Sequence, residues 1–288
     1  MSVPFVTGPM TEVLHDWRER QAAHRERVQR LTEGHRRRRA EGDRHPVWDF
    51  MFSYYPTTPG KLSHWHPGVN KAVVWDGGDD LPQYKDHYVR QGDVWILDVE
   101  RYMAARGKTV RYIARLLDAT YRHPPVLGCF GLHEWAMVYK DAPRHPEPLR
   151  LGARGTDEVV EKSQLKCTHF DAYRFFTDAA APRNAHTPTR DSQPQLEQPG
   201  CLHATMDLYK WATKLGPLVP GELWLDCFEL ACDVRRLDME ASPYDLREWG
   251  FEPVRIETPA GRAEYVQRQK GLMDRGQEIR KQLLAYTG

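Results

Sequence analysis

Apolar residues recur with the period of an α-helix in five stretches of the chain. In the first stretch Val13, Trp17 and Val28 fall close to one stripe, and arginines cover the other faces. The last stretch begins with a Thr-Pro pair at 258–259, which is a typical helix start. We expect Gly107 to break or kink the second helix. The five predicted helices are residues 10–41, 99–120, 202–215, 221–240 and 259–285.

A smaller part of the chain carries strand-like patterns. Residues 166–176, KCTHFDAYRFF, alternate in the way that places every second side chain on one face of a strand. That predicted face carries Cys167, His169, Asp171, Tyr173 and Phe175. Further predictions are short strands at residues 71–75, 94–99 and 254–256 and a turn at residues 77–80. Because the segments do not alternate as βαβ units, the predicted fold class is mainly α with a small β component (α+β).

Other segments follow no clear period. Residues 129–139, CFGLHEWAMVY, fit a strand and a buried helix equally well. Prolines and glycines predict loops over residues 141–157 and 177–200, and a loop as long as the second is usually functional or disordered. We predict an N-terminal basic amphipathic helix in residues 1–44 and a single compact catalytic domain in residues 45–288.

The composition is that of an ordinary globular protein. Hydrophobic residues make up 40% and charged residues 28% of the 288 residues. No apolar run approaches the roughly 18 residues that cross a bilayer, and the N-terminus lacks the pattern of a secretory signal. The five cysteines form no CxxC pair, which is typical of free thiols in a reducing compartment. We therefore expect a soluble, cytoplasmic protein that does not contact membranes.

Arginines cluster in two places although the formal net charge is only +1. That net charge excludes binding to polyanions through bulk charge alone, but a local basic strip is enough for phosphate contact. One cluster ends the first predicted helix and the other lies in the 141–157 loop, and each is also compatible with a simple solvated surface. The predicted phosphate contacts are Arg36, Arg37, Arg38, Arg39, Arg144, Arg150 and Arg154.

Titratable side chains stand among apolar neighbours in several segments. Glu134 lies between His133 and Trp135, and burying a carboxylate without a partner costs several kcal/mol. Such perturbed acids are typical of active sites, whereas a single buried histidine is more often a satisfied core residue. One face of the predicted helix 202–215 carries His203, Asp207 and Trp211. One face of the next helix carries Asp226, Glu229, Asp233, Arg236 and Glu240, a stripe that also fits a solvated ion-pair network.

The same residue types leave a metal site open as an alternative. Histidines and carboxylates on facing helices bind iron, manganese or zinc in many helical proteins. The candidate ligands are His133, His169, His203, Glu229 and Asp233. Their spacing gives no support, because HExxH and Glu-x-x-His motifs are absent and the adjacent side chains of His133 and Glu134 should point apart. We predict no metal and no cofactor, and keep a metal-dependent oxygenase or hydrolase of a small molecule as the alternative function.

Several long motifs resemble those of one protein family. The motifs are HPVWDFMFSYYP, HWHPG, CFGLHEWAMVY, CTHFDAYRFF, PGCLHATMDLYKW and LDMEASPYDL. They resemble a group of bacterial proteins, common in actinobacteria, described as 3-methyladenine DNA glycosylases, over nearly the whole chain. The chain is also similar to a phage-defence DNA glycosylase that removes glucosylated hydroxymethylcytosine from the DNA of T-even phages. The resemblance implies cleavage of the N-glycosidic bond of a modified base, which leaves an abasic site.

The resemblance and the buried polar residues together predict a glycosylase site. Such an enzyme flips its base out of the duplex, stacks the base on aromatic rings and stabilises the developing positive charge of the sugar with a carboxylate. The predicted catalytic carboxylates are Asp171, Glu134 and Asp207. The predicted base pocket is lined by Tyr54, Tyr55, Trp65, His66, His133, Trp135, His169 and Tyr173.

Two further features refine this prediction. The chain has no clear helix-hairpin-helix signature and no lysine in a nucleophile context, which favours a monofunctional enzyme that uses water. The predicted partner is double-stranded DNA, such as phage DNA with modified bases, and no obligate protein partner is inferred. The third candidate function is a DNA-binding module without catalysis. The buried acidic residues argue against it.

Overall fold

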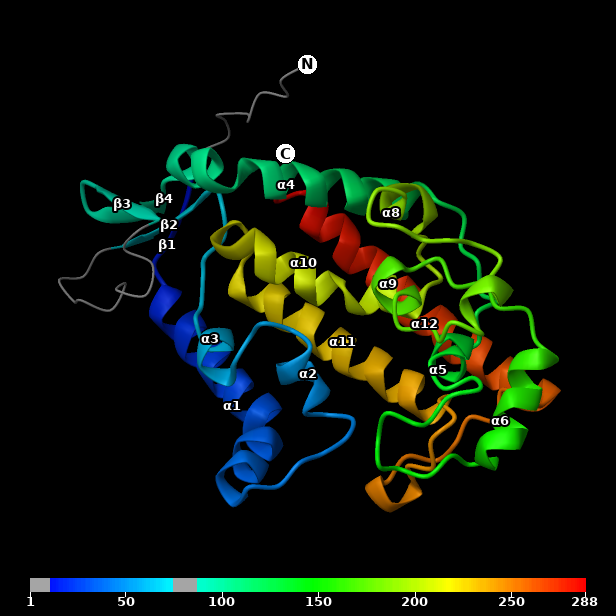
Figure 1. The fold of residues 1–288 in the computed structure, drawn as a ribbon. Helices are drawn as coiled ribbons and strands as arrows, with labels where there is room; N and C mark the ends of the chain where they lie inside the picture. The colour runs from blue at the N-terminus through cyan, green and yellow to red at the C-terminus, as the bar shows by residue number, and fades with distance from the viewer. Residues whose placement is uncertain (1–10, 75–86) are drawn as a thin grey trace. The chain divides into compact units, whose positions relative to one another are not determined.

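The computed structural model describes residues 11–74 and 87–288 of the chain (Figure 1). The chain folds into two compact units. Unit 1 is made of residues 1–117, 209–229 and 279–288, and unit 2 is made of residues 118–208 and 230–278. The turn predicted at residues 77–80 lies outside the described residues.

Unit 1 contains a four-stranded sheet with the strand order β1-β2-β4-β3. β1 (Glu12–Leu14) runs parallel to β2 (Lys71–Val74), while β4 (Val94–Leu97) is antiparallel to β2 and to β3 (Tyr88–Gln91). The sequence pattern predicts β2 and β4 correctly. It wrongly places the residues of β1 in a helix, because their pairing with β2 depends on the tertiary fold and leaves no local signal.

The long basic helix of unit 1 is α1 (Trp17–Glu41). It begins at Trp17 and not at residue 10, since the preceding residues form β1. The buried face carries Trp17, Gln21, His24, Val28 and Thr32. These positions repeat every three to four residues, so the helix buries one narrow stripe and leaves its arginine-rich faces outside.

The remaining elements of unit 1 enclose an aromatic core. They are α2 (Phe50–Ser53), α3 (Pro59–Leu62), most of α4 (Val99–Arg122), most of α10 (Leu208–Leu215), η3 (Gly216–Leu218), the first half of α11 (Gly221–Glu240) and the end of α12 (Pro259–Leu284). The ring of Tyr209 meets Tyr55 and Phe228 edge to face, with centroids 5.0 and 5.1 Å apart. This geometry is one that aromatic pairs prefer, and it makes the core of the unit.

Unit 2 combines the end of α4, the second half of α11 and most of α12 with a series of short helices. The short helices are α5 (Leu132–Ala136), α6 (Gly152–Glu161), α7 (Phe170–Tyr173), η2 (Ala181–Arg183), α8 (Gln193–Leu196), α9 (Leu202–Met206) and η4 (Arg247–Trp249). Short helices leave many backbone groups without intrahelical partners. The connecting segments also need partners for their backbone, and Gln198 accepts hydrogen bonds from the backbone amides of Val126 and Gly200.

The strand predicted at residues 166–176 is wrong. Within this stretch Phe170–Tyr173 form α7, because the imidazole Nδ1 of His169 accepts a hydrogen bond from the Ala172 amide and caps the helix. The predicted strand face, with every second residue on one side, therefore does not exist. An alternating pattern over so short a stretch does not exclude a capped helical turn.

Three other local predictions also need correction. The predicted loop at 141–157 gives way to α6 at Gly152. The predicted strand at 254–256 has no strand partner, and the Val254 amide instead donates to the carbonyl of Glu240. The predicted helix 202–215 is divided at Asp207 into α9 and α10.

The long helices follow the sequence pattern closely. α4, α11 and α12 form near their predicted limits, and α4 continues through Gly107 without a break. The predicted fold class, mainly α with a small β component, is confirmed. Within the two described ranges, none of the helices combines the length and the apolar composition that crossing a membrane requires.

Candidate active site

The short helix α5 places two predicted site residues, His133 and Glu134, in the interior of unit 2. The residue before the helix is Gly131, whose φ of 73° lies in the left-handed region that favours glycine. A Cβ on this residue would lie 3.2 Å from the Cβ of Ala241, so the close packing also favours glycine. The sequence left residues 129–139 open between strand and helix, and the structure shows the helix.

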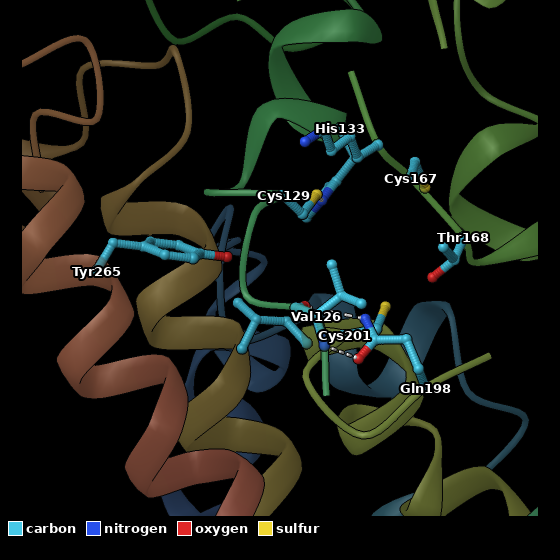
Figure 2. A pocket seen from close by; sticks show the side chains of 10 residues that line it. Val126, Cys129, His133, Cys167, Thr168, Gln198, Cys201 and Tyr265 are labelled. Carbon is cyan, nitrogen blue, oxygen red and sulfur yellow. Dashed lines mark hydrogen bonds between the residues drawn. The ribbon is translucent and has the colours of Figure 1, made fainter. Parts of the chain in front are cut away.

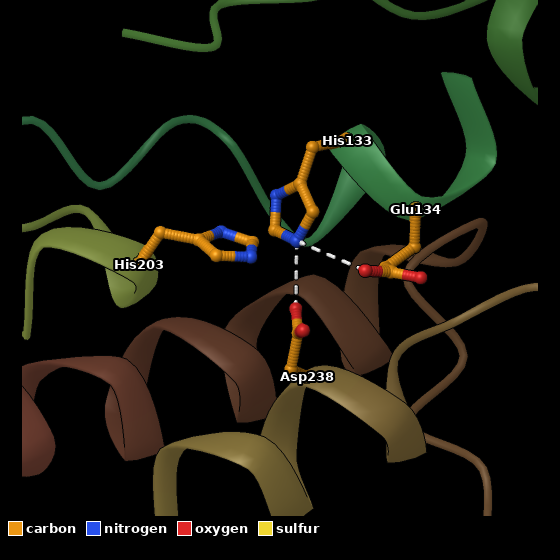
Figure 3. A group of neighbouring side chains, drawn as sticks. All are labelled: His133, Glu134, His203 and Asp238. Atoms are coloured by element: carbon orange, nitrogen blue, oxygen red, sulfur yellow. Dashed lines mark hydrogen bonds and ion pairs between the residues drawn. The ribbon is translucent and has the colours of Figure 1, made fainter. Parts of the chain in front are cut away.

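His133 and Glu134 meet His203 from α9 and Asp238 from α11 (Figure 3). His133 Nε2 lies 2.7 Å from Asp238 Oδ1 and 4.0 Å from Glu134 Oε1. The rings of His133 and His203 meet edge to face with centroids 4.4 Å apart. These four residues are named the interior cluster, and one ligand atom from each lies within 4.8 Å of the others.

The expectation that His133 and Glu134 point apart is therefore wrong. Neighbouring residues on a helix differ in direction by about 100°. The long glutamate side chain bridges that difference and turns its Oε1 toward His133.

Arg235 adds a positive charge beside the two carboxylates of the interior cluster. Its Nη1 lies 3.4 Å from Asp238 Oδ2 and 4.0 Å from Glu134 Oε1. Burial disfavours the charged form of each member, but Asp238 holds the pKa of His133 well above its usual value, and His133 lowers the pKa of Asp238. Burial and the charge of Asp238 raise the pKa of Glu134. Burial and the charge of His133 lower the pKa of His203 to about 3.

A second buried network adjoins the interior cluster and contains Asp207, another predicted catalytic residue. His169 Nε2 lies 3.3 Å from both Glu197 Oε1 and Asp207 Oδ2. The ring of His169 stacks on His203 with centroids 5.3 Å apart, and Gln193 donates a hydrogen bond to Glu197. His169, Glu197 and Asp207 are all fully buried or nearly so. The carboxylates of Glu197 and Asp207 repel each other when both are ionised, so a proton held between them and His169 stabilises the network.

Asp171 lies where this network reaches the surface. Its Oδ1 accepts a hydrogen bond from Arg190 Nη2 at 3.0 Å, and Arg174 Nε lies 3.8 Å away. Arg190 also donates to Gln193 at 3.1 Å. The Asp171 side chain is 5% exposed, whereas the two arginine side chains are about half exposed and each lies over a phenylalanine ring. Asp171 is thus a desolvated carboxylate covered by two cations that reach solvent.

A small pocket lies beside the interior cluster (Figure 2). His133 lines it, with its Nδ1 3.4 Å from the Sγ of Cys129. The other lining residues are Val126, Lys166, Cys167, Thr168, Gln198, Cys201, Leu202 and Tyr265. The pocket has room for about one water molecule, which is less than a nucleobase needs. Of the residues predicted to line a base pocket, His133 lines this one.

Four of the predicted pocket residues belong to unit 1, where three are buried and Tyr54 is half-buried. They are Tyr54, Tyr55, Trp65 and His66. Trp65 Nε1 donates to Glu222 Oε1 at 3.0 Å, and His66 Nδ1 lies 3.4 Å from the hydroxyl of Tyr88. Burial lowers the pKa of His66 well below its usual value. Tyr55, Trp65 and His66 are therefore core residues of unit 1, and the sequence pattern does not separate such packing from a base pocket.

Trp135 and Tyr173 are held by their own contacts in unit 2. Trp135 is fully buried, and its Nε1 donates to the carbonyl of Ala241 at 2.9 Å. Tyr173 is half-buried and donates from its hydroxyl to the carbonyl of Ala181 at 3.5 Å. Both therefore support the segments that carry His133 and Asp171.

The arginines predicted to bind phosphate fall into two groups. Arg150 forms two hydrogen bonds with Glu257, and Arg38 forms one with Asp49; their side chains are 8% and 16% exposed. These two arginines stabilise the fold, so we withdraw them as phosphate contacts. The exposed members are Arg36, Arg37, Arg39, Arg144 and Arg154. Phosphate binding by this second group stays a prediction.

The acidic stripe of α11 forms ion pairs. Arg27 binds Asp226 at 2.7 Å and Glu229 at 2.9 Å, and Arg275 binds Asp233 at 2.7 Å. The alternative metal ligands Glu229 and Asp233 are thus engaged by arginines. The carboxylates of the interior cluster come from other residues.

Sequence reasoning misses Asp238, Arg235 and Glu197. Asp238 stands between two apolar residues of α11 and off its acidic stripe, and this is a local signal that could have found it. Glu197 lies in the proline-rich segment 177–200, where no periodic pattern marks a buried position.

Comparisons with protein-family models, curated proteins and solved structures find no match to this chain. The functional interpretation therefore depends on the residues and the geometry described above.

Proposed function

We propose that the protein is a DNA glycosylase that cleaves the N-glycosidic bond of a modified base and leaves an abasic site. The observation that carries the proposal is Asp171, a desolvated carboxylate at the edge of a buried polar network and beneath two half-exposed arginines. The motifs that resemble DNA glycosylases support the same reaction class. The substrate class is double-stranded DNA with a modified base, and glucosylated hydroxymethylcytosine is the first base to test.

In the proposed reaction Asp171 stabilises positive charge on the sugar. Cleavage of the N-glycosidic bond builds this charge, and a carboxylate in a water-poor site interacts with it more strongly than one in bulk water. In the unbound protein Arg190 and Arg174 neutralise Asp171. DNA phosphates compete for these guanidinium groups, because arginine binds phosphate through the same paired donors. Withdrawal of the arginines leaves Asp171 facing the sugar.

The buried residues behind Asp171 position it and handle protons. His169 caps the helix that carries Asp171 and is itself held between Glu197 and Asp207. Glu134 Oε1 lies 4.0 Å from Nε2 of His133, which lines the small pocket, so Glu134 accepts through His133 the proton of a water held there.

The modified base must leave the duplex before its bond is cut. The pocket at His133 has room for about one water molecule, so it suits the attacking water and not the base. Residues 186–192 are mostly exposed and carry Arg190. Movement of this segment with Arg190 toward a phosphate opens the space over Asp171 in the proposed complex.

Base release by amide variants tests the proposal. Asp171→Asn and Glu134→Gln keep the side-chain shape and remove the negative charge. Each variant is incubated with duplex DNA that carries glucosylated hydroxymethylcytosine, 3-methyladenine or only normal bases. Mass spectrometry detects free bases, and strand cleavage at abasic sites gives the rate. We expect each variant to release the modified base at least about 100-fold more slowly than the unchanged protein.

Glu257→Gln is the matched control. Glu257 is also a largely buried carboxylate of unit 2 and pairs with Arg150, but it lies outside both polar networks. We expect this variant to release the base at the unchanged rate, with circular dichroism confirming that all variants fold. Unchanged release by both Asp171→Asn and Glu134→Gln contradicts the site. Absence of release from every DNA by the unchanged protein contradicts the function.

A further inference from the structure

The interior cluster gathers two imidazoles and two carboxylates from three separate helices. Figure 3 shows the side chains of His133, Glu134, His203 and Asp238 directed at one point between α5, α9 and α11. Their ligand atoms all lie within 4.8 Å of one another. Three of the side chains are buried, and that of Glu134 is 12% exposed. A buried cluster of charged side chains contributes little to stability by itself, so stability does not explain why these four residues are buried together.

We infer that the interior cluster binds one divalent first-row transition metal ion, such as Zn²⁺, Mn²⁺ or Fe²⁺. Imidazole nitrogens and carboxylate oxygens are ligands that these ions accept. A tetrahedral ion with bonds of about 2.0 Å separates its ligand atoms by about 3.3 Å. The separations in the cluster range from 2.7 Å between His133 and Asp238 up to the 4.8 Å limit, and they bracket this value. Small side-chain rotations therefore close the set around an ion.

The surroundings hold the four ligands in place. The Nδ1 of His133 faces the sulfur of Cys129 at 3.4 Å, which leaves Nε2 for the ion. Arg235 lies 3.4 Å from Asp238 Oδ2, so it can hold the carboxylate oxygen that the ion does not use. The imidazole of His169 stacks on the ring of His203 and holds it in place. A hydrogen-bonded outer partner, as Arg235 is to Asp238, is typical of carboxylate metal ligands.

The charges leave a place for one further anion. Metal ligands bind in the deprotonated form, so His133 gives up a proton when the ion binds. Two neutral imidazoles, two carboxylates, the Arg235 guanidinium and a divalent ion then carry one net positive charge. A bound hydroxide neutralises that charge, because a metal ion lowers the pKa of its water ligand. The pocket that His133 lines has room for about one water molecule. The cluster and the pocket together therefore fit an ion with one exchangeable water ligand.

Metal binding by the full chain tests the inference without any measurement of DNA cleavage. The protein is purified without a histidine tag, and its metal content is determined. After removal of metal with a chelator it is titrated with Zn²⁺ in a calorimeter, with Mn²⁺ and with anaerobic Fe²⁺ in parallel. We expect one ion to bind per chain, and the thermal unfolding midpoint to rise by several degrees with the preferred ion.

Variants locate the bound ion. We expect His203→Gln and Asp238→Asn to weaken binding by more than the roughly 100-fold that loss of an outer partner causes. The matched controls are Asp233→Asn, an exposed aspartate of α11 that pairs with Arg275, and His145→Gln, an exposed histidine of unit 2. We expect both controls to bind the ion with unchanged affinity.

Three results would overturn the inference. One is that no tested ion binds the unchanged protein at stoichiometric level. Another is that folded His203→Gln binds the ion as tightly as the unchanged protein, and the last is that the controls lose binding to the same extent. If Asp238→Asn does not fold, the metal affinities of His203→Gln and Glu134→Gln test the site instead. Because none of these readouts uses DNA, the metal site and the proposed glycosylase activity stand or fall separately.

Discussion

The two units bury polar side chains in different ways. In unit 1 some buried side chains each have one neutral backbone partner: Tyr102 donates to the carbonyl of Leu215 at 2.9 Å, and Trp17 donates to that of Val74 at 2.9 Å. In unit 2 several buried titratable groups meet in networks, as around His133 and His169. Neutral bonds of the first kind stabilise a fold modestly, whereas buried charges rarely do.

This difference separates residues that the sequence makes look alike. Trp65 and His66 of unit 1 carry the same residue types as Trp135 and His133 of unit 2. Only the histidine of unit 2 has both a buried carboxylate and a second imidazole as neighbours. The number of titratable partners, and not the presence of a buried histidine, therefore distinguishes a candidate site from a core.

The largest effect on stability is expected where a buried charge loses its partner. Asp238→Asn leaves the interior cluster with excess positive charge at His133 and Arg235. We expect the free energy of unfolding, measured in urea, to fall by about 3–5 kcal/mol. Asp233→Asn on the same helix removes an exposed charge and should cost less than about 1 kcal/mol. Equal losses in the two variants would show that the buried pair has no special role.

A smaller, pH-dependent effect is expected at Asp49 in unit 1. Burial alone would raise the pKa of Asp49, but hydrogen bonds from Arg38 and His35 lower it to about 2 from a usual value of 3.8. A carboxyl group with a lowered pKa in the folded state contributes stability above its unfolded pKa, and this contribution is lost as the pH falls toward 2. The loss is on the order of 2 kcal/mol. Urea unfolding between about pH 5 and about pH 2 should show it, and Asp49→Asn should lack this part of the slope.

The smallest effect is expected at a neutral hydrogen bond of unit 1. Tyr102→Phe removes the hydroxyl that donates to Leu215 and leaves the ring in place. We expect the free energy of unfolding to fall by about 1 kcal/mol. Tyr121→Phe, at an exposed ring, is the control and should change it little. A loss at Tyr102 as large as that at Asp238 would remove the contrast between the two units.

Long elements could be predicted from the sequence, and short ones could not. α4, α11 and α12 repeat their apolar positions over many turns, so the period is unambiguous. α7 is four residues long, and its capping histidine outweighs an alternating pattern that fits a strand. β1 depends on a partner strand far along the chain. Local patterns carry no information about such partners.

The candidate site could be predicted in part for the same reason. Glu134 and Asp171 stand among apolar neighbours, and this local signal predicts their burial correctly. The partner of His133 is Asp238, which lies 105 residues away in the sequence. Only the fold brings these residues together, so sequence reasoning finds one half of the pair and misses the other.

The division of the chain between the units has a consequence for its synthesis. Unit 1 includes residues 279–288 as well as the N-terminal segment, and unit 2 is built from two segments that residues 209–229 separate. Domains that are continuous in sequence can fold while the ribosome is still translating the rest of the chain. Because unit 1 includes residues 279–288, we expect it to be completed only after all segments of unit 2 have been translated.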